Sequence, residues 1–338
     1  MSVSDARREG AALPPVPARR RPLAPFDALV LLTTLVWGSN YTIVKTALRQ
    51  IPEFGFNALR LVIASTLFMA VLAVYPGRDA SARGETRRAN RRLFPTARPF
   101  SRREWVVLLG LAAAGHFLYQ LCFLGSVART SVANSSFIIG TSPVAVSLLS
   151  AAVGQERVSR LHWVGAAVSL SGIYLLVGVG ASVSRASAIG DLLMIAGVCC
   201  WAVYAVGSGP LLARHSPLAI TGYTMAMGTL MYLPFGLPDL VRLDWSAVTA
   251  GAWAGLVFSA VFALFAAYII WHTSIQRVGN VRTAMYSNLI PVSALATAIL
   301  VLGDRPSPRQ AAGAGAVLVG VGLTRLRRRR LPELPAEE

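Results

Sequence analysis

Charge is scarce along most of this chain. Only 14% of its 338 residues are Asp, Glu, Lys or Arg, whereas an ordinary soluble domain has about one quarter. The charges cluster, and long apolar stretches separate the clusters, so that 54% of all residues are hydrophobic. About 20 consecutive apolar residues span a bilayer as a helix, and the chain supplies such stretches repeatedly. This pattern excludes a soluble globular domain and predicts a polytopic protein embedded in a lipid bilayer.

Cysteines and catalytic motifs are also scarce. The three cysteines, Cys122, Cys199 and Cys200, all fall in apolar segments and lack the spacing of a metal site, so neither a metal nor a disulfide framework is expected. The sequence has no H-E-x-x-H motif, no acid pair inside an apolar segment and no phosphate-binding Walker loop. We therefore expect no catalytic residue, no cofactor and no ATP-driven step in this chain.

The net charge of +17 suggests two kinds of partner. In a soluble protein it would favour nucleic acid. Here the arginines lie in tails and in loops between apolar segments, where they orient helices against the cytoplasmic leaflet. The second explanation fits the distribution, so no nucleic-acid partner is expected.

Ten apolar segments follow one another along the chain. Their continuous runs lack the alternation of barrel strands, and a bilayer requires each to satisfy its own backbone, so all are expected to be helices. The segments cover residues 26–48, 54–75, 105–127, 132–153, 161–180, 189–211, 217–238, 247–272, 281–302 and 309–325. The predicted fold class is an all-α membrane protein with ten transmembrane helices.

The basic residues support an even number of spans. With ten spans and both termini inside, 24 of the 32 Lys and Arg residues lie on the cytoplasmic side and six lie outside. That bias agrees with the positive-inside rule. Residues 1–25 have no apolar core, so we expect a disordered cytoplasmic tail there rather than a signal peptide. A basic cytoplasmic loop at 76–104 and a cytoplasmic C-tail at 326–338 complete this topology in a bacterial cytoplasmic membrane.

An internal repeat divides the chain into halves at 26–180 and 189–325. At a constant offset of 148, residues 126–156 align with residues 274–304. The matched pairs are Arg129 with Arg277, Pro143 with Pro291, Glu156 with Asp304, Gly165 with Gly313, and Gly172 with Gly320. Each half has five segments, so the second half crosses the membrane in the opposite sense. Inverted repeats of this kind are typical of secondary transporters.

Several motifs resemble the EamA family of the drug/metabolite transporter superfamily. They are the run from Trp37 to Lys45, the arginine in Asn57–Arg60, and a proline followed by an acid in each half, at Pro143 with Glu156 and at Pro291 with Asp304. Gln155 departs from the family's glycine, and Asp304 departs from its glutamate. The resemblance covers about residues 26–325 and implies a ten-helix carrier of small metabolites or drugs with a central cavity.

Polar and aromatic residues inside the segments are candidates for substrate binding. Ionisable residues in a membrane span are costly, and an aromatic cavity with a few polar groups is what a small ligand requires. The expected substrate-binding residues are Trp37, Asn40, Tyr41, Lys45, Arg60, His116, Tyr119, Gln120, Asn134, Trp201, Tyr204, Tyr268, Tyr286 and Asn288. Gln120 and Tyr268 are equivalent positions of the repeat.

Structural explanations stand beside these assignments. Lys45 either attracts an anionic substrate group or anchors its helix at the interface. Arg60 either binds a carboxylate or phosphate, or bonds to carbonyls of a neighbouring helix. His116 either lines the cavity or packs with a satisfied polar tip. His272 is expected at the membrane interface, because it closes its segment.

Other repeated residues predict local structure. Pro143 and Pro291 are expected to kink their helices, exposing carbonyls for polar neighbours or for substrate. Glu156 and Asp304 are expected to cap the helix that follows each of them. The glycines at 165, 172, 313 and 320 suit close helix packing, with a homodimer face left open.

Taken together, the sequence predicts a secondary transporter. It would move small metabolites or drugs, with amino acids or their analogues among the candidates, by alternating access and with export favoured. A channel or a facilitative exchanger is the alternative, and an intramembrane enzyme is a more remote one.

Overall fold

The protein is described by a computed structural model. The structure describes residues 25–74, 99–156, 158–177, 185–297 and 307–325. Within these ranges all regular structure is helical. The N-tail, most of the basic loop, Asp304 and the C-tail from residue 326 lie outside the described residues.

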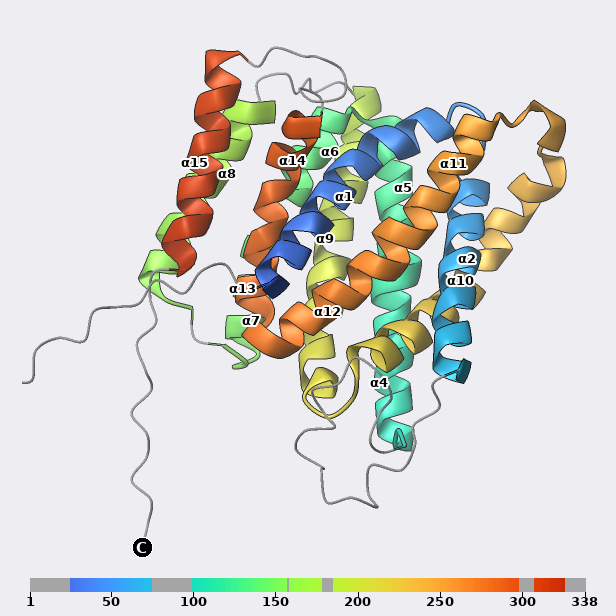
Figure 1. Cartoon of the computed structure of the whole chain (residues 1–338), viewed down its shortest axis with the longest axis horizontal. Coiled ribbons are helices and arrows are strands. Elements are labelled where there is room, and N and C mark those ends of the chain that lie inside the picture. Colours follow the sequence, from blue (N-terminus) through green and yellow to red (C-terminus); the bar gives the residue numbers. More distant parts are fainter. Residues whose placement is uncertain (1–24, 75–98, 157, 178–184, 298–306, 326–338) are drawn as a thin grey trace, which may run out of the picture.

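Long helices run roughly across the molecule and pack side by side (Figure 1). In the first half they are α1 (Pro25–Ala47), α2 (Glu53–Val74), α4 (Arg102–Ala112), η3 (Ala113–Leu118), α5 (Tyr119–Arg129), α6 (Val132–Ile139), α7 (Ser142–Ala152) and α8 (Arg160–Val177). In the second half they are α9 (Arg185–Leu212), α10 (Pro217–Arg242), η5 (Trp245–Ala247), α11 (Ala250–Phe258), η6 (Ser259–Ala266), α12 (Ala267–Val278), α13 (Asn280–Met285), η7 (Tyr286–Leu289), α14 (Ile290–Thr297) and α15 (Pro308–Arg325). Helix fills most of the described part of each predicted segment.

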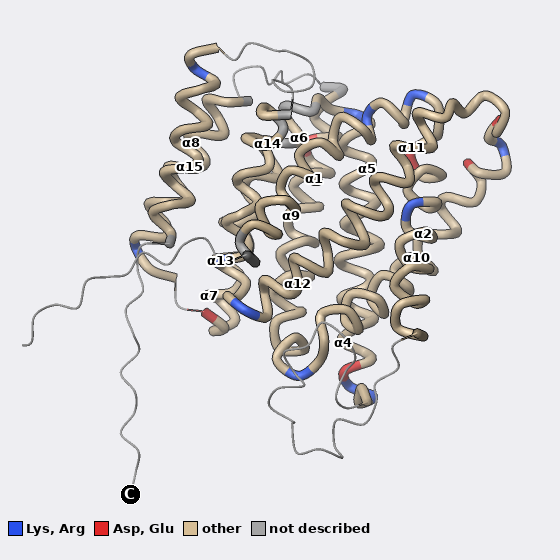
Figure 2. The backbone as a smooth tube through the Cα atoms, in the orientation of Figure 1, with Lys and Arg blue, Asp and Glu red and all other residues tan. Residues whose placement is uncertain are grey.

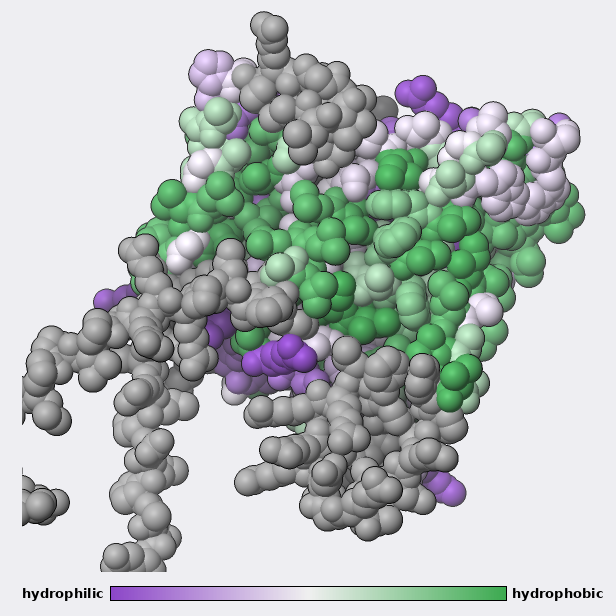
Figure 3. Space-filling model, in the orientation of Figure 1, coloured by the Kyte–Doolittle hydropathy of each residue, from purple (hydrophilic) through white to green (hydrophobic). Residues whose placement is uncertain are grey.

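The surface has the polarity of a membrane protein. Charged residues gather toward the two ends of the helices, and the tube between them is almost free of charge (Figure 2). A broad apolar band crosses the visible face, with hydrophilic residues at its edges (Figure 3). Four helical stretches in the described ranges are long and apolar enough to cross a bilayer: Glu53–Val74, Arg102–Arg129, Ser187–Leu212 and Ala250–Val278. The apolar segments are therefore helical and suited to a membrane.

Helix interruptions fall at equivalent positions in the two halves. α6 ends at Ile139 and α7 begins at Ser142, immediately before Pro143. In the second half the α-helix gives way to a 3-10 turn before α14 begins at Ile290, immediately before Pro291. Proline lacks an N–H and clashes with the preceding turn, so each interruption has a local cause in the sequence. Both helices are thus interrupted at the positions where the sequence predicts kinks.

Two stretches of π-helix also correspond. η3 lies in the rod from α4 to α5, and η6 lies in the rod from α11 to α12. At the repeat offset of 148, the residues of η3 fall within η6. A π-helical turn loosens the regular hydrogen-bond ladder and frequently marks a functional site. Neither stretch contains proline, so no residue type marks either of them.

The repeated glycines bring α8 and α15 into backbone contact (Figure 1). A Cβ atom at Gly165 would lie 2.6 Å from the carbonyl oxygen of Gly320, and one at Gly172 would lie 2.7 Å from that of Gly313. The contacts are reciprocal. Gly165 of α8 meets Gly320, the repeat equivalent of Gly172, and Gly172 meets Gly313, the repeat equivalent of Gly165. The close packing predicted for these glycines is therefore present within one chain, so it does not supply the dimer face that the sequence left open.

Replacing Gly172 by leucine is expected to destabilise the protein. The new side chain would collide with backbone atoms of Gly313 and Val317, which cannot move aside cheaply. Overpacking of this kind costs about 1–3 kcal/mol. Thermal unfolding in detergent measures the loss, and the control is Gly315→Leu on the partner helix α15, where a Cβ meets nothing within 4 Å. Equal melting temperatures for the two variants would contradict the prediction.

Glu156 caps a different helix from the one predicted. Its Oε1 accepts hydrogen bonds from the backbone N–H of Asn280 at 2.6 Å and of Val281 at 3.2 Å. It therefore caps α13 of the second half rather than α8, the helix that follows it. Gln155 reinforces the contact, because its Oε1 accepts from Asn280 Nδ2 at 2.9 Å. The prediction was wrong because it considered only the nearest helix in sequence, whereas the fold brings α7 against α13.

Replacing Glu156 by alanine is expected to loosen this contact between the halves. It leaves two backbone N–H groups of α13 without their acceptor, and loss of a cap costs about 1 kcal/mol. Hydrogen exchange at Asn280 and Val281 should quicken while exchange in α8 stays unchanged. Faster exchange in α8 instead would support the original local-cap interpretation.

Candidate functional site

A cavity lies among helices of both halves. It holds about 540 Å³ of space between atoms, a figure that includes space open to solvent. Its lining comes from α1, α2, α5, α7, α9, α14, η6, η7 and α12, and from the last residue of α6. The lining residues are Trp37, Asn40, Tyr41, Arg60, Tyr119, Gln120, Phe123, Ile139, Ser142, Trp201, Ala263, Leu264, Tyr268, Ser287 and Ile290.

Eight of the fourteen predicted site residues meet in this cavity. They are Trp37, Asn40, Tyr41, Arg60, Tyr119, Gln120, Trp201 and Tyr268. The other six, Lys45, His116, Asn134, Tyr204, Tyr286 and Asn288, do not line it. The lining is also paired by the repeat: Gln120 with Tyr268, Ile139 with Ser287, and Ser142 with Ile290 are each 148 residues apart.

Arg60 is a cation buried in the cavity wall, with 2% of its surface exposed. Its Nη1 donates to Ser259 Oγ and its Nη2 donates to Gln120 Oε1, both at 3.0 Å. Its Nε has no hydrogen-bond partner, and no carboxylate within the described ranges forms an ion pair with it. Both partners are neutral side chains rather than the backbone carbonyls considered from the sequence. Burying an uncompensated charge is costly, so the group is suited to an incoming anion.

Asn40 adds an acceptor to the same cavity. It is 4% exposed, and its Oδ1 has no partner in the part of the chain that the structure describes. A ligand that satisfied both Asn40 and Arg60 would carry an acceptor for the guanidinium and a donor for the amide oxygen. A carboxylate and an ammonium or hydroxyl group on one small molecule meet that description.

The rest of the wall is aromatic. The Trp37 ring lies 5.0 Å from Trp271, 6.0 Å from Trp201 and 6.1 Å from Tyr268, centroid to centroid. Trp37 Nε1 donates to the carbonyl oxygen of Ala263 at 2.9 Å. That carbonyl belongs to η6, so the π-helix supplies an acceptor for Trp37. Ring edges and faces at these separations attract one another and offer apolar contact area to a ligand.

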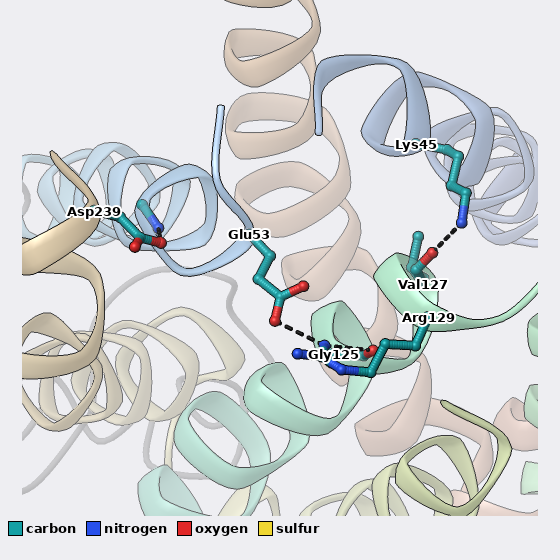
Figure 4. Close-up of polar contacts among 7 residues, drawn as sticks. Lys45, Glu53, Gly125, Val127, Arg129 and Asp239 are labelled. Atoms are coloured by element: carbon teal, nitrogen blue, oxygen red, sulfur yellow. Dashed lines mark hydrogen bonds and ion pairs between the residues drawn. The ribbon is translucent and has the colours of Figure 1, made fainter. Parts of the chain in front are cut away.

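Lys45 and Asn134 make contacts outside the cavity, and Figure 4 shows the contact of Lys45 with Val127. Lys45 Nζ donates to the carbonyl oxygens of Val127 and Thr130, tying the end of α1 to the end of α5. Asn134 Nδ2 donates to both carboxylate oxygens of Asp191 at 3.2 Å. Neither side chain lines the cavity, and each bonds to groups of a neighbouring helix or its end.

An ion pair lies at the same end of the molecule. Arg129 Nη1 meets Glu53 Oε1 at 2.7 Å and also donates to the Gly125 carbonyl at 3.0 Å (Figure 4). Asp239 Oδ2 accepts from the Gly55 N–H at 3.1 Å nearby. These contacts hold the α1–α2 connection against α5 and α10.

The remaining four predicted residues are buried behind or beside the cavity wall. His116 Nε2 and the Tyr204 hydroxyl are 2.9 Å apart. Tyr286 and Asn288 lie in η7 and are 6% and 1% exposed. His272, expected at the membrane interface, is fully buried, because α12 continues to Val278 rather than ending at 272. That prediction was wrong by one and a half helical turns.

Seven lining residues were not predicted as binding residues. Ser142 and Ile290 directly precede the repeated prolines, so the repeat could have indicated them. Phe123 lies on the same helical face as Tyr119. Ala263 and Leu264 belong to η6, and Ile139 and Ser287 lie at the helix interruptions. Residue type alone does not indicate that any of these four lines the cavity. Groups of three or more metal-ligating residues are absent from the described ranges.

The sequence matches the EamA-like transporter family twice, over residues 25–178 and 188–326. The chain therefore belongs to this family of small-molecule transporters, and it is a helical membrane protein.

Relatives support the transporter class. An uncharacterized transporter of Archaeoglobus fulgidus is 28% identical over 88% of this chain and 96% of its own length. A probable terminal-alkyne amino-acid exporter of Streptantibioticus cattleyicolor is 26% identical over 87% and 91%. A probable amino-acid metabolite efflux pump of Escherichia coli is 24% identical over 87% and 92%. One crystal structure shares the fold with a TM-score of 0.67, at 20% identity, over 88% of this chain and 96% of that one.

Proposed function

We propose that this transporter is a secondary carrier for small carboxylates of the amino-acid type, working by alternating access. The observation that carries the proposal is Arg60, a buried cation in an aromatic cavity whose only hydrogen-bond partners in the described chain are neutral. A substrate carboxylate would neutralise it, and an ammonium group would reach the unpaired oxygen of Asn40. The names of the relatives favour amino-acid compounds and export.

The proposed architecture has ten spans in two inverted halves, 26–180 and 189–325, with both termini in the cytoplasm. Three observations support it: the bias of Lys and Arg, the helix interruptions at equivalent positions, and the reciprocal glycine contacts of α8 with α15. Labelling of single cysteines from either side tests it. A C-tail that reacts from outside the cell would overturn the ten-span arrangement.

Alternating access requires contacts that close each end of the cavity in turn. At one end, Asp239 of α10 accepts from the Gly55 N–H of α2, and Asp191 of α9 accepts from Thr130 and Asn134. At the other end, Glu156 and Gln155 join α7 to the start of α13. We propose that these two sets break alternately as the halves rock.

Uptake of a panel of radiolabelled L-amino acids into proteoliposomes tests the carrier. A carrier saturates with substrate, and the same substrate preloaded inside accelerates uptake. Flux that rises linearly without saturation would instead indicate a channel. Chemical change of the amino acid during uptake would indicate an enzyme.

A further inference from the structure

Two buried histidines lie behind the cavity wall, one from each half. His116 belongs to η3 and His272 to α12, and neither has any exposed surface. Both contact the ring of Tyr204 edge-on, with centroids 4.8 and 5.1 Å away. Both also lie beside the ring of Tyr268, which lines the cavity, at 5.4 and 6.4 Å. Two aromatic rings therefore separate the pair from the substrate space.

The hydrogen bonds of His272 leave one of its nitrogens as a bare lone pair. Its Nδ1 lies 3.1 Å from the Tyr268 carbonyl oxygen, which can only accept, so Nδ1 carries the proton. The Thr221 hydroxyl, 3.2 Å from the same Nδ1, donates its own proton to the Pro217 carbonyl. His272 Nε2 is then unprotonated, and within the described residues it has no partner.

The same reasoning applies to His116. Thr224 donates to the Ile220 carbonyl at 2.8 Å, which leaves its oxygen to accept from the Tyr204 hydroxyl at 3.2 Å. The Tyr204 oxygen in turn accepts from His116 Nε2 at 2.9 Å. His116 Nδ1 is then the bare nitrogen, and it too lacks a partner in the described part of the chain. The pair thus presents two basic nitrogens with no donor beside either.

The charged and titratable surroundings of the pair are few. Tyr204 of α9 and Tyr268 of α12 contact the pair through their rings, and Tyr204 also through a hydrogen bond. On α10, Thr221 contacts His272 and Thr224 bonds to Tyr204. Further away, Arg60 of α2 donates to Gln120. α10 also covers His116 closely, since a Cβ at Gly228 would lie 2.4 Å from His116 Cβ. Among these groups Arg60 carries a permanent charge. It interacts with Tyr268, whose ring lies beside both histidines, and its positive sign opposes protonation of the pair while the cavity is empty.

We propose that His116 and His272 form a proton-binding site that takes up one proton when a carboxylate neutralises Arg60. The step adds one proton from bulk water to one imidazole lone pair and forms one imidazolium; no other bond is made or broken. A second proton is excluded, because two adjacent imidazoliums repel. The inference rests on the proposed carboxylate site. By linkage, the proton then raises substrate affinity, and substrate and proton cross together.

The experiment uses the full chain in proteoliposomes with a trapped pH-sensitive dye and the L-amino acid that gives saturable uptake. Wild-type protein should move about one proton with each substrate, and its substrate affinity should rise by up to about tenfold per unit fall in pH. His116→Gln and His272→Gln keep a hydrogen-bonding side chain but cannot take a proton. Each should weaken the proton signal and the pH dependence, and the double variant should abolish both, while downhill substrate flux persists.

The matched control is His162→Gln. His162 is also a buried histidine bonded to a hydroxyl, Ser147 at 2.8 Å, but it lies on α8 and not behind the cavity wall. It should leave the proton signal intact. If a glutamine variant fails to fold, Tyr204→Phe removes the hydroxyl that fixes His116 and should lower the proton-to-substrate ratio.

The outcomes separate the two proposals. Saturable amino-acid uptake without proton movement, or with movement unchanged in both glutamine variants, overturns the histidine site and leaves the carrier standing. Absence of saturable amino-acid uptake overturns the carboxylate site, and with it the proton site that depends on it.

Discussion

Replacement of Arg60 by methionine is expected to lower the apparent affinity for a carboxylate substrate at least about 30-fold. Removing one member of a buried, hydrogen-bonded charge pair costs about 2–5 kcal/mol, and 2 kcal/mol corresponds to about 30-fold in affinity. Methionine is a sensible replacement because the second helices of the two halves, each with a proline at its start, Pro52 and Pro217, align at an offset of 165. This offset pairs Arg60 with Met225, which is fully buried. The helix can therefore pack a thioether in this environment.

A second substitution separates charge from geometry. Arg60→Lys keeps the charge but loses the planar fork that bonds Ser259 and Gln120 together, so an intermediate loss is expected. Arg242→Met, an exposed arginine at the end of α10, is the matched control and should transport normally. The measurement is concentration-dependent uptake at equal protein in the membrane. Wild-type affinity in Arg60→Met would refute the anion site and leave Arg60 as a packing residue.

Replacement of Trp37 by alanine is expected to reduce substrate affinity by about 30-fold or more. Trp37 contacts Trp201, Tyr268 and Trp271, and aromatic residues at the centre of a desolvated site contribute about 2 kcal/mol or more. The variant also strips the Ala263 carbonyl of its hydrogen bond. Binding to purified protein, measured by calorimetry, reports the change.

Trp37→Phe divides these contributions. It retains a ring but removes the indole N–H, so affinity should fall by less than in Trp37→Ala. The melting temperature should also fall, because the Ala263 carbonyl of η6 loses its hydrogen-bond donor. Trp245→Ala is the control: this tryptophan is 45% exposed and stacks on Trp253 outside the cavity. A loss of affinity in Trp245→Ala as large as that in Trp37→Ala would mean that general destabilisation, not the site, explains the effect.

Much of the helical arrangement was predictable because its causes are local. Long apolar runs must form helices in a bilayer, and Pro143 and Pro291 interrupt them by removing a donor. Much of the cavity was predictable for a related reason. Polar groups are costly in contact with lipid, so Arg60, Gln120 and the hydroxyl of Tyr268 must face inward, and inward-facing residues of several helices converge.

The features that could not be predicted from the sequence depend on contacts between distant segments. Glu156 caps α13, 124 residues away, because α7 and α13 are neighbours in space. Lys45 is drawn to the carbonyl oxygens at the end of α5, a choice that a single helix cannot reveal. No residue type marks the π-helices, so the position of Ala263 in the cavity wall could not be predicted. His272 was misplaced because α12 continues beyond it, through mostly polar residues, to Val278.

The partners of Arg60 also bear on how the chain is made. Gln120 and Ser259 follow Arg60 by 60 and 199 residues, so α2 leaves the ribosome before either partner exists. During that interval the bilayer must accept a bare guanidinium, at a cost of about 2.5–3.5 kcal/mol near the middle of a helix. The apolar remainder of α2 offsets that cost, and completion of α11 and η6 relieves it. The membrane-inserted state of α2 is thus fully stabilised only after Ser259 has been synthesised, about three-quarters of the way along the chain.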